Sequence, residues 1–162
     1  MVIWIMGLSG SGKTTLAKII CKKLRYKKIL HIDGDKVREM YNHDLGHSIK
    51  DRLVNAGRIS RLVRFVSEQN INVIVSVLSN FPDWLIWNRK NIKNYFEVYL
   101  KTDLIILKKR RPNLYSGKIK NVVGLDIGFR EPKKSDLLVN NCKSLVELEI
   151  IAKKIIRKTK IN

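Results

Sequence analysis

The chain has 162 residues, of which 44% are hydrophobic and 29% charged, so we expect one folded domain with a substantial core rather than a disordered chain. It has only two cysteines and no run near 18 apolar residues, which excludes a disulfide framework and a membrane-spanning helix and favours the cytoplasm. Lysine and arginine outnumber aspartate and glutamate by 33 to 14, which favours anionic partners such as phosphorylated metabolites or nucleic acid.

Short β-rich runs alternate with helical patterns along the chain. In chain order the predicted elements are strand Val2–Met6, helix Thr14–Leu24, strand Lys28–Ile32, helix Lys50–Glu68, strand Ile71–Val77, helix Asp83–Asn91, strand Phe96–Leu100, helix Leu104–Lys109, strand Leu137–Val139 and helix Leu145–Lys158. Such alternation indicates an α/β fold in which helices cover both faces of a five-stranded parallel sheet. Ligands of such sheets gather at the carboxyl ends of the strands.

Residues 110–132 interrupt this alternation with a polar, basic and glycine-containing stretch. A loop of that length inside a compact domain is usually functional, and we predict that it forms a lid. Repeats, low-complexity segments and linkers are absent from the sequence. We therefore predict a single domain over residues 1–162 that includes the lid.

Residues 7–14 read Gly-Leu-Ser-Gly-Ser-Gly-Lys-Thr and match the phosphate-loop motif G-x-x-x-x-G-K-[ST] between a predicted strand and a predicted helix. Glycines let backbone N–H groups surround phosphate oxygens, and the following helix presents its positive end. The motif predicts a P-loop NTPase-type three-layer α/β/α fold. Lys13 should reach the β- and γ-phosphates and the Thr14 hydroxyl should bind Mg²⁺. The predicted nucleotide-binding residues are Gly7, Ser9, Gly10, Ser11, Gly12, Lys13, Thr14 and Thr15.

The positions of the acidic residues indicate the class of nucleotide enzyme. The base-reading N-K-x-D of GTPases is absent, and the third predicted strand runs into residues 78–80 (Leu-Ser-Asn) without the acidic residue usual in ATPase motors. Asp33 and Asp35 instead follow the second strand, where carboxylates can accept a hydroxyl proton or organise Mg²⁺ in a small-molecule kinase. The alternative is a simple turn in which Asp35 caps a helix, and both roles can coexist.

Four motifs occur in the order found in adenylylsulfate kinases: residues 7–15, residues 33–38 (Asp-Gly-Asp-Lys-Val-Arg), Asp51-Arg52-x-x-Asn55-x-x-Arg58 and residues 117–126. The chain thus resembles that family over roughly residues 2–150. The resemblance implies a homodimer that uses ATP and Mg²⁺ to phosphorylate the ribose 3′-hydroxyl of adenosine 5′-phosphosulfate.

The resemblance also implies roles for individual residues. Asp35, with Asp33 beside it, would act as the base or organise Mg²⁺ directly or through water, and Arg110 would lie against ATP. The implied acceptor-binding residues are Arg38, His47, Arg52, Asn55, Ser79, Ile119, Lys120 and Val122.

The chain departs from the family where relatives bind adenine. His47 replaces Phe of D-L-G-F-S, and Val122 replaces Phe of the lid sequence I-K-N-F-T-G. The lid is about five residues shorter, and Arg111 replaces the usual aspartate. Base–aromatic stacking is worth about 1–3 kcal/mol per base, so adenine selection should be weaker.

Residues 88–99 resemble the branch of the family associated with surface-polysaccharide synthesis. One chemistry of that branch is 3′-phosphorylation of cytidine diphosphoramidate in capsule modification, and a shorter lid fits its smaller base. The sequence therefore favours that acceptor, with authentic adenylylsulfate kinase as the alternative. A nucleic-acid-binding P-loop protein is a remote third, supported only by the net charge of +19, and we expect neither a stable nucleic-acid partner nor a membrane partner.

A few conspicuous side chains have ordinary structural explanations. We expect His31 to belong to the sheet, and Cys21 and Cys142 to be packing residues. Trp84 and Trp87 could contact the acceptor or simply pack.

Overall fold

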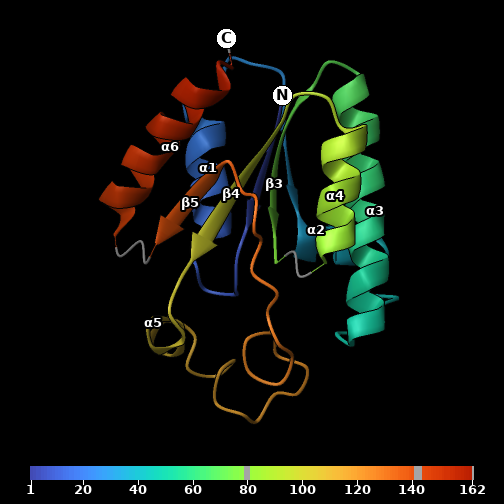
Figure 1. Cartoon of the computed structure of the whole chain (residues 1–162), viewed down its shortest axis with the longest axis vertical. Coiled ribbons are helices and arrows are strands. Elements are labelled where there is room, and N and C mark those ends of the chain that lie inside the picture. Colours follow the sequence, from blue (N-terminus) through green and yellow to red (C-terminus); the bar gives the residue numbers. More distant parts are fainter. Residues whose placement is uncertain (79–80, 141–143, 162) are drawn as a thin grey trace.

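A parallel sheet between two helical layers forms the frame of the molecule (Figure 1). The computed structural model describes residues 1–78, 81–140 and 144–161. The strands there are β1 (Val2–Met6), β2 (Ile29–Asp33), β3 (Asn72–Val77), β4 (Tyr95–Lys101) and β5 (Leu137–Asn140). Neighbouring strands are all parallel, in the order β2-β3-β1-β4-β5. The predicted α/β class and five-stranded parallel sheet are confirmed.

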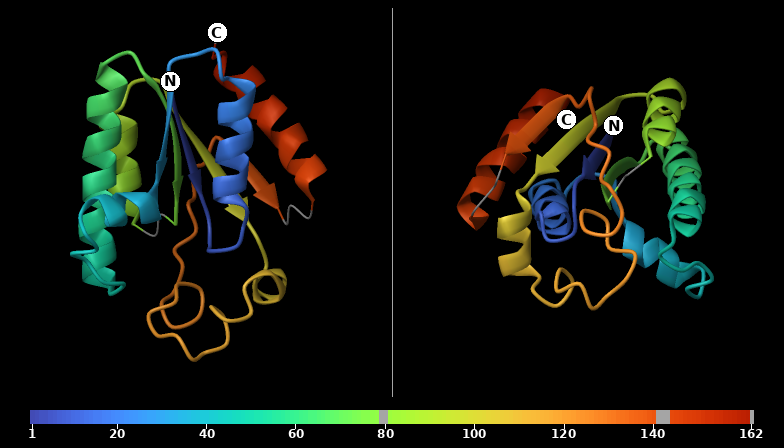
Figure 2. Two further views of the ribbon diagram at one scale, coloured as in Figure 1. Left: turned by 180° about the vertical axis from the view of Figure 1, so that it is seen from behind. Right: turned by 60° about the horizontal axis from the view of Figure 1, so that its bottom comes forward.

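Helices cover both faces of this sheet (Figures 1 and 2). They are α1 (Lys13–Lys23), α2 (Gly34–Met40), α3 (Ile49–Glu68), α4 (Pro82–Asn91), α5 (Leu104–Arg110) and α6 (Leu145–Thr159). Side chains alternate along β1: Ile3 and Ile5 pack with α1 and α6, whereas Val2, Trp4 and Met6 pack on the other face with α3. Every residue of β1 is buried because the strand is central and covered on both faces.

The second strand leads directly into α2, which the sequence did not predict as a separate helix. Asp33, and not Asp35, is the N-cap residue: it has extended backbone angles, and its side chain accepts a hydrogen bond from the Asp35 N–H at 3.0 Å. The expectation that Asp35 caps the helix was therefore wrong, because the helix begins at Gly34, immediately after β2.

A capping box fixes the start of α3. The Ser48 hydroxyl accepts a hydrogen bond from the Asp51 N–H, and the Asp51 carboxylate accepts one from the Ser48 N–H. Residues three apart share one side of a helix, so a start at Ile49 places Arg52 and Asn55 together on the side that faces β2 and β3.

Residues 111–136 form a loop with only one isolated bridge, between Val123 and Ile127. Figures 1 and 2 show most of this segment beyond the carboxyl ends of the strands, where the predicted lid would have to lie, and its last part running back along the sheet to the beginning of β5. It has a small core of its own, in which Tyr115 and Val122 are buried with Leu107 of α5. The Tyr115 hydroxyl also donates a hydrogen bond to the Ser9 carbonyl at 2.8 Å, which attaches the segment to the phosphate loop.

The conspicuous side chains have the following surroundings. His31 lies on β2 at the sheet edge, with its Nε2 2.8 Å from the Ser76 hydroxyl. Cys21 is part of α1 and packs against the core, and Cys142 lies outside the described residues. Trp84 and Trp87 form an edge-to-face pair on α4. Among the helices that the structure describes, none has both the length and the apolar character needed to span a membrane.

Candidate functional site

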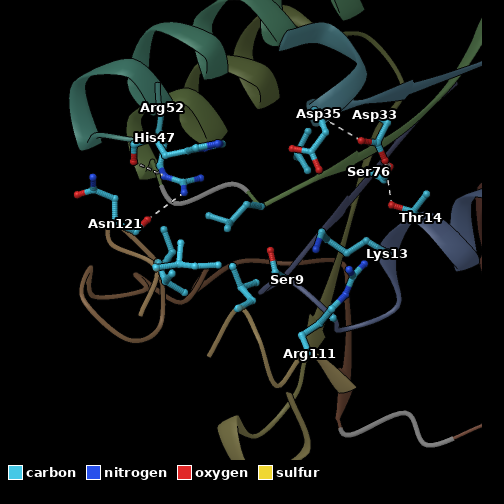
Figure 3. A pocket seen from close by; sticks show the side chains of 18 of the residues that line it. Ser9, Lys13, Thr14, Asp33, Asp35, His47, Arg52, Ser76, Arg111 and Asn121 are labelled. Atoms are coloured by element: carbon cyan, nitrogen blue, oxygen red, sulfur yellow. Dashed lines mark hydrogen bonds between the residues drawn. The ribbon is translucent and has the colours of Figure 1, made fainter. Parts of the chain in front are cut away.

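A cavity of about 470 Å³ opens at the carboxyl ends of the strands (Figure 3). Its walls come from the phosphate loop, the ends of β2 and β3, the beginning of α3 and the segment 111–123. The lining residues are Ser9, Gly10, Lys13, Thr14, Asp33, Gly34, Asp35, His47, Arg52, Ser76, Val77, Leu78, Arg111, Leu114, Ile119, Lys120, Asn121, Val122 and Val123. This is the edge of a parallel sheet at which ligands are expected.

The phosphate loop connects β1 to α1 through backbone angles that require glycine. Gly12 has φ +100° and precedes the first residue of α1. Gly7 has φ +150°, and a Cβ there would lie 2.5 Å from the Leu100 carbonyl oxygen. The loop therefore turns tightly and directs the amino end of α1, with its free N–H groups, at the cavity.

Lys13 is the first residue of α1 and extends back under the loop. Its Nζ donates a hydrogen bond to the Leu8 carbonyl at 2.9 Å. Burial lowers the pKa of Lys13 to about 8; the charges of Asp35 and Asp33 oppose this shift, and that of Arg111 adds to it. The ammonium is thus held close to the two carboxylates and ready for an anion.

The Asp33 carboxylate accepts hydrogen bonds from three donors. Its Oδ1 accepts from the Asp35 N–H, and its Oδ2 accepts from the Thr14 hydroxyl at 2.9 Å and from the Ser76 hydroxyl at 2.6 Å (Figure 3). Partial burial alone would raise the pKa of Asp33, but these hydrogen bonds outweigh it and the pKa is lowered. Asp33 is therefore an ionised group that orients its neighbours.

The Asp35 carboxylate also lines the cavity, but in the described part of the chain no donor binds it. Of the two carboxylates, Asp35 is the one that can accept a proton from a ligand. The two aspartates thus have different surroundings, and Asp35, which the family resemblance favours as the base, is the one without a hydrogen-bond donor.

A second cavity of about 70 Å³ adjoins the first and shares Gly34, Asp35 and Arg52 with it. Asn55 lines it and is 5% exposed; its Nδ2 is 3.5 Å from the Gly34 carbonyl, and its Oδ1 has no partner in the described structure. Arg38 lies there too and donates from Nη1 to the carbonyls of Leu45 at 3.3 Å and Gly46 at 2.7 Å. A buried guanidinium and amide at the end of a cavity suit a small anionic group.

Arg52 connects the beginning of α3 to the segment 111–136. Its Nε donates to the His47 carbonyl at 2.9 Å and its Nη2 to the Asn121 carbonyl at 3.1 Å (Figure 3). Burial, reinforced by the charges of Arg52 and Arg38, lowers the pKa of His47, so its imidazole is neutral at neutral pH. The cation and the neutral ring lie side by side at the mouth of the cavity.

The other residues implied by the family resemblance are distributed as follows. Ile119, Lys120 and Val122 line the main cavity, although Val122 is only 4% exposed and belongs mostly to the core of the segment. Ser79 lies outside the described residues. Arg110 donates to the Gly10 carbonyl at 3.1 Å and, with Ser11, Gly12 and Thr15, lines a third cavity of about 240 Å³ on the other side of the phosphate loop.

The site residues predicted from the sequence do not include three polar side chains that line the main cavity: Ser76, Arg111 and Asn121. Ser76 could have been suspected because it is a hydroxyl residue in an apolar strand; it pairs in register with Asp33. The sequence marked Arg111 as a departure from the family and as part of a basic run, residues 108–111, at the entrance of the predicted lid, but did not include it among the site residues. Of the two tryptophans, Trp84 lines the second cavity as well as packing on Trp87.

The segment 88–99 lies away from the main cavity. It runs from the end of α4 through β4, where the fully buried Glu97 carboxylate pairs with Arg89 and the Glu97 N–H donates to Asp136. None of residues 88–99 lines the main cavity, so the resemblance of this segment to one branch of the family does not bear on the lining of that cavity.

Comparisons with known proteins agree with this geometry. The family model for adenylylsulphate kinase matches residues 1–140. A cytidine diphosphoramidate kinase from Campylobacter jejuni is 36% identical over 164 residues, covering 95% of each chain. A probable adenylyl-sulfate kinase from Archaeoglobus fulgidus is 38% identical over 150 residues, covering 88% of this chain and 97% of its own.

Solved structures give the same result. The Mycobacterium tuberculosis APS kinase in complex with AMPPNP and APS has a TM-score of 0.86 and 29% identity, covering 98% of this chain and 96% of its own. A sugar kinase from Janibacter with 14% identity and a TM-score of 0.70 shares the fold. The chain therefore belongs to the adenylylsulphate kinase family, whose members are phosphotransferases acting on a hydroxyl acceptor.

Proposed function

We propose that this kinase transfers the γ-phosphoryl group of ATP to the ribose 3′-hydroxyl of a nucleotide with an acidic 5′ group. Among such acceptors we propose cytidine diphosphoramidate, used in capsule modification, over adenosine 5′-phosphosulfate. The observation that carries the reaction is that Lys13, the unpartnered carboxylate of Asp35 and the guanidinium of Arg52 line one cavity. Phosphate binding, proton acceptance and anion recognition then occur in a single place.

In this proposal the ATP phosphates lie against the N–H groups of the phosphate loop and the ammonium of Lys13, with Arg110 beside the nucleotide. Asp35 accepts the proton of the attacking hydroxyl. The Thr14 hydroxyl donates a hydrogen bond to Asp33, which leaves the lone pairs of the Thr14 oxygen available to a cation.

The residues present fit Mg²⁺. This ion prefers hard oxygen ligands, keeps several waters and is bound in kinases by one or two protein groups together with substrate phosphates. The Thr14 hydroxyl, oriented by Asp33, and the Asp35 carboxylate, directly or through water, would hold it. When bound, Mg²⁺ neutralises charge on the phosphates.

The acceptor would place its 5′ group toward Arg38, Arg52 and Asn55 and its base toward the segment 119–122. The described lining of the main cavity includes no phenylalanine, tyrosine or tryptophan, so a base meets aliphatic and polar side chains and His47. This lining supports a base selected by hydrogen bonds rather than by stacking between rings. The C. jejuni relative, which matches 95% of both chains, supports the pyrimidine acceptor.

A coupled ADP-release assay over cytidine diphosphoramidate, adenosine 5′-phosphosulfate and plain nucleotides tests the proposal. We expect the highest kcat/KM with cytidine diphosphoramidate and no turnover with Lys13→Ala, because that variant lacks the charge that neutralises the transferred group. A strong preference for adenosine 5′-phosphosulfate would establish authentic adenylylsulfate kinase activity, which the A. fulgidus relative favours, and would overturn the acceptor proposed here.

We also infer a homodimer, which rests on the family resemblance alone. Light scattering of the purified protein measures the mass directly, against 18.8 kDa for one chain. A mass of twice that value is expected, and a monomer or a larger assembly would contradict the inference.

A further inference from the structure

The lining of the main cavity includes a positively charged side chain, Arg111, that is not part of the phosphate-loop motif. Arg111 directly follows α5, where its N–H donates to the Leu107 carbonyl at 2.8 Å and its own carbonyl accepts from the Tyr115 N–H at 3.1 Å. The Tyr115 hydroxyl in turn donates to the Ser9 carbonyl. Arg111 therefore occupies a turn that is attached at both ends, by α5 and by the phosphate loop.

The Arg111 side chain extends along the phosphate loop into the cavity. Its Cγ would lie 3.1 Å from a Cβ built on Gly10, so the stem packs over that glycine. Figure 3 shows the guanidinium extending toward Lys13. Within residues 1–78, 81–140 and 144–161, no carboxylate or carbonyl accepts a hydrogen bond from this guanidinium, whereas Arg110 next to it donates to the Gly10 carbonyl. Its N–H donors are available to a ligand.

The Lys13 ammonium and the Arg111 guanidinium repel each other, because the charge of Arg111 disfavours the charged form of Lys13. Like charges facing one another are stabilised when an anion lies between them. The carboxylate of Asp33 is occupied by Thr14 and Ser76 on the side of β2 and β3. Asp35 offsets part of this repulsion at Lys13, and an anionic ligand group in contact with both Lys13 and Arg111 would offset it further.

We propose that Arg111 is a catalytic residue that binds the oxygens of the transferred phosphoryl group together with Lys13. This assignment rests on the kinase function proposed above. In the transfer, the bond from the γ-phosphorus to the bridging oxygen breaks and its electron pair leaves with ADP. The bond from the acceptor oxygen to phosphorus forms, and the hydroxyl proton goes to Asp35. A guanidinium matches two phosphoryl oxygens at once and stabilises the charge that spreads over them during transfer.

Three variants test the assignment. Arg111→Ala should lower kcat about 100-fold while changing the KM for ATP less than threefold, because the lost interaction is made mainly in the transition state. Arg111→Lys should retain intermediate activity, and added guanidinium should partly restore Arg111→Ala. The matched control is Lys109→Ala, which removes the same charge from the exposed end of α5 and should keep kcat within twofold of the unsubstituted protein.

Two results would overturn the assignment. One is a kcat for folded Arg111→Ala within threefold of the unsubstituted protein; the other is a raised KM with unchanged kcat, which would make Arg111 a ground-state contact only. If the protein phosphorylates no nucleotide in the acceptor panel, the proposed function fails, but slow ATP hydrolysis by water still tests Arg111. Equal hydrolysis rates with and without the Arg111 side chain would then refute its catalytic role.

Discussion

At the scale of single residues, hydrogen bonding separates Asp33 from Asp35. Both carboxylates line the same cavity, two positions apart in the sequence, yet Asp33 accepts three hydrogen bonds and Asp35 accepts none in the described structure. A carboxylate that accepts several hydrogen bonds is a poor base, because protonation would break them. The structure therefore makes Asp33 the helix cap, and the unpartnered carboxylate of Asp35 fits the base that we propose.

Substituting each aspartate should accordingly give different phenotypes. Asp35→Asn should lower kcat at least 100-fold and leave the melting temperature nearly unchanged, because it removes a base and no internal hydrogen bond. Asp33→Ala should lower the free energy of unfolding by about 1–2 kcal/mol as well as activity, since the α2 cap is lost. Steady-state kinetics and urea unfolding of both variants measure this contrast; an Asp35→Asn enzyme that is unstable but fully active would refute it.

The Lys13 ammonium should make nucleotide binding depend on pH. Its pKa is lowered to about 8, chiefly by burial, so the free protein loses this charge above pH 8 while a bound phosphate restores it. Binding above pH 8 must then take up a proton, so the Kd for ADP should rise about tenfold in total from pH 7 to pH 9, with most of the rise above pH 8. Calorimetry with ADP and a chelator at pH 7, 8 and 9 measures the effect. Lys13→Ala should bind weakly and show no such rise, and a constant Kd in the unsubstituted protein would contradict the prediction.

At the scale of elements, the strands and most helices could be predicted from hydrophobic patterns. Each predicted strand lies within one or two residues of an observed one, and the helices with long apolar faces, such as Ile49–Glu68, were also found. The helix Gly34–Met40 was missed because it has seven residues, begins with glycine and has little apolar periodicity. Short helices of this kind are determined by their cap and by packing.

The arrangement of the segment 111–136 could not be predicted because contacts between distant residues determine it. Tyr115 meets Ser9 across 106 positions, and Arg52 meets Asn121 across 69. The sequence did indicate that Ile119, Lys120 and Val122 belong beside the acceptor, through the family resemblance. It did not indicate that Val122 is packed inside the segment, beside Leu107 and Tyr115.

The packing of Val122 affects which of the two aromatic rings that relatives use to bind adenine can be restored in this chain. His47 is exposed at the mouth of the cavity, so His47→Phe can present a ring and should shift kcat/KM about tenfold toward adenosine 5′-phosphosulfate, since one stack is worth about 1–3 kcal/mol. Val122→Phe should instead lower the free energy of unfolding by about 1–3 kcal/mol, because the residue is buried. Competition assays with both acceptors and thermal unfolding test the two variants. An unchanged acceptor ratio for His47→Phe would show that no base lies there.

At the scale of the whole molecule, the net charge of +19 matters for encounter with substrates. ATP and the proposed acceptors are all anionic, and a positive field concentrates such ligands around the protein. Helices α1 and α6 on one face of the sheet and α4 on the other all carry basic residues in their last turns, so the positive charge is distributed over both faces rather than confined to one stripe. Duplex or RNA recognition usually needs such a stripe or an inserted element.

Ionic strength should therefore affect kcat/KM and kcat differently. Raising KCl from 20 to 200 mM shortens the Debye length from roughly 20 Å to roughly 7 Å and screens the steering field, so kcat/KM for the acceptor should fall several-fold. The value of kcat should change little, because the transferred group is held by residues inside the cavity. Initial rates at both salt concentrations measure this, with sucrose-matched viscosity as a control. Equal losses in kcat and kcat/KM would show that salt acts on the site itself. Tight duplex DNA binding with a steep salt slope and no phosphoryl transfer would instead identify a nucleic-acid-binding protein.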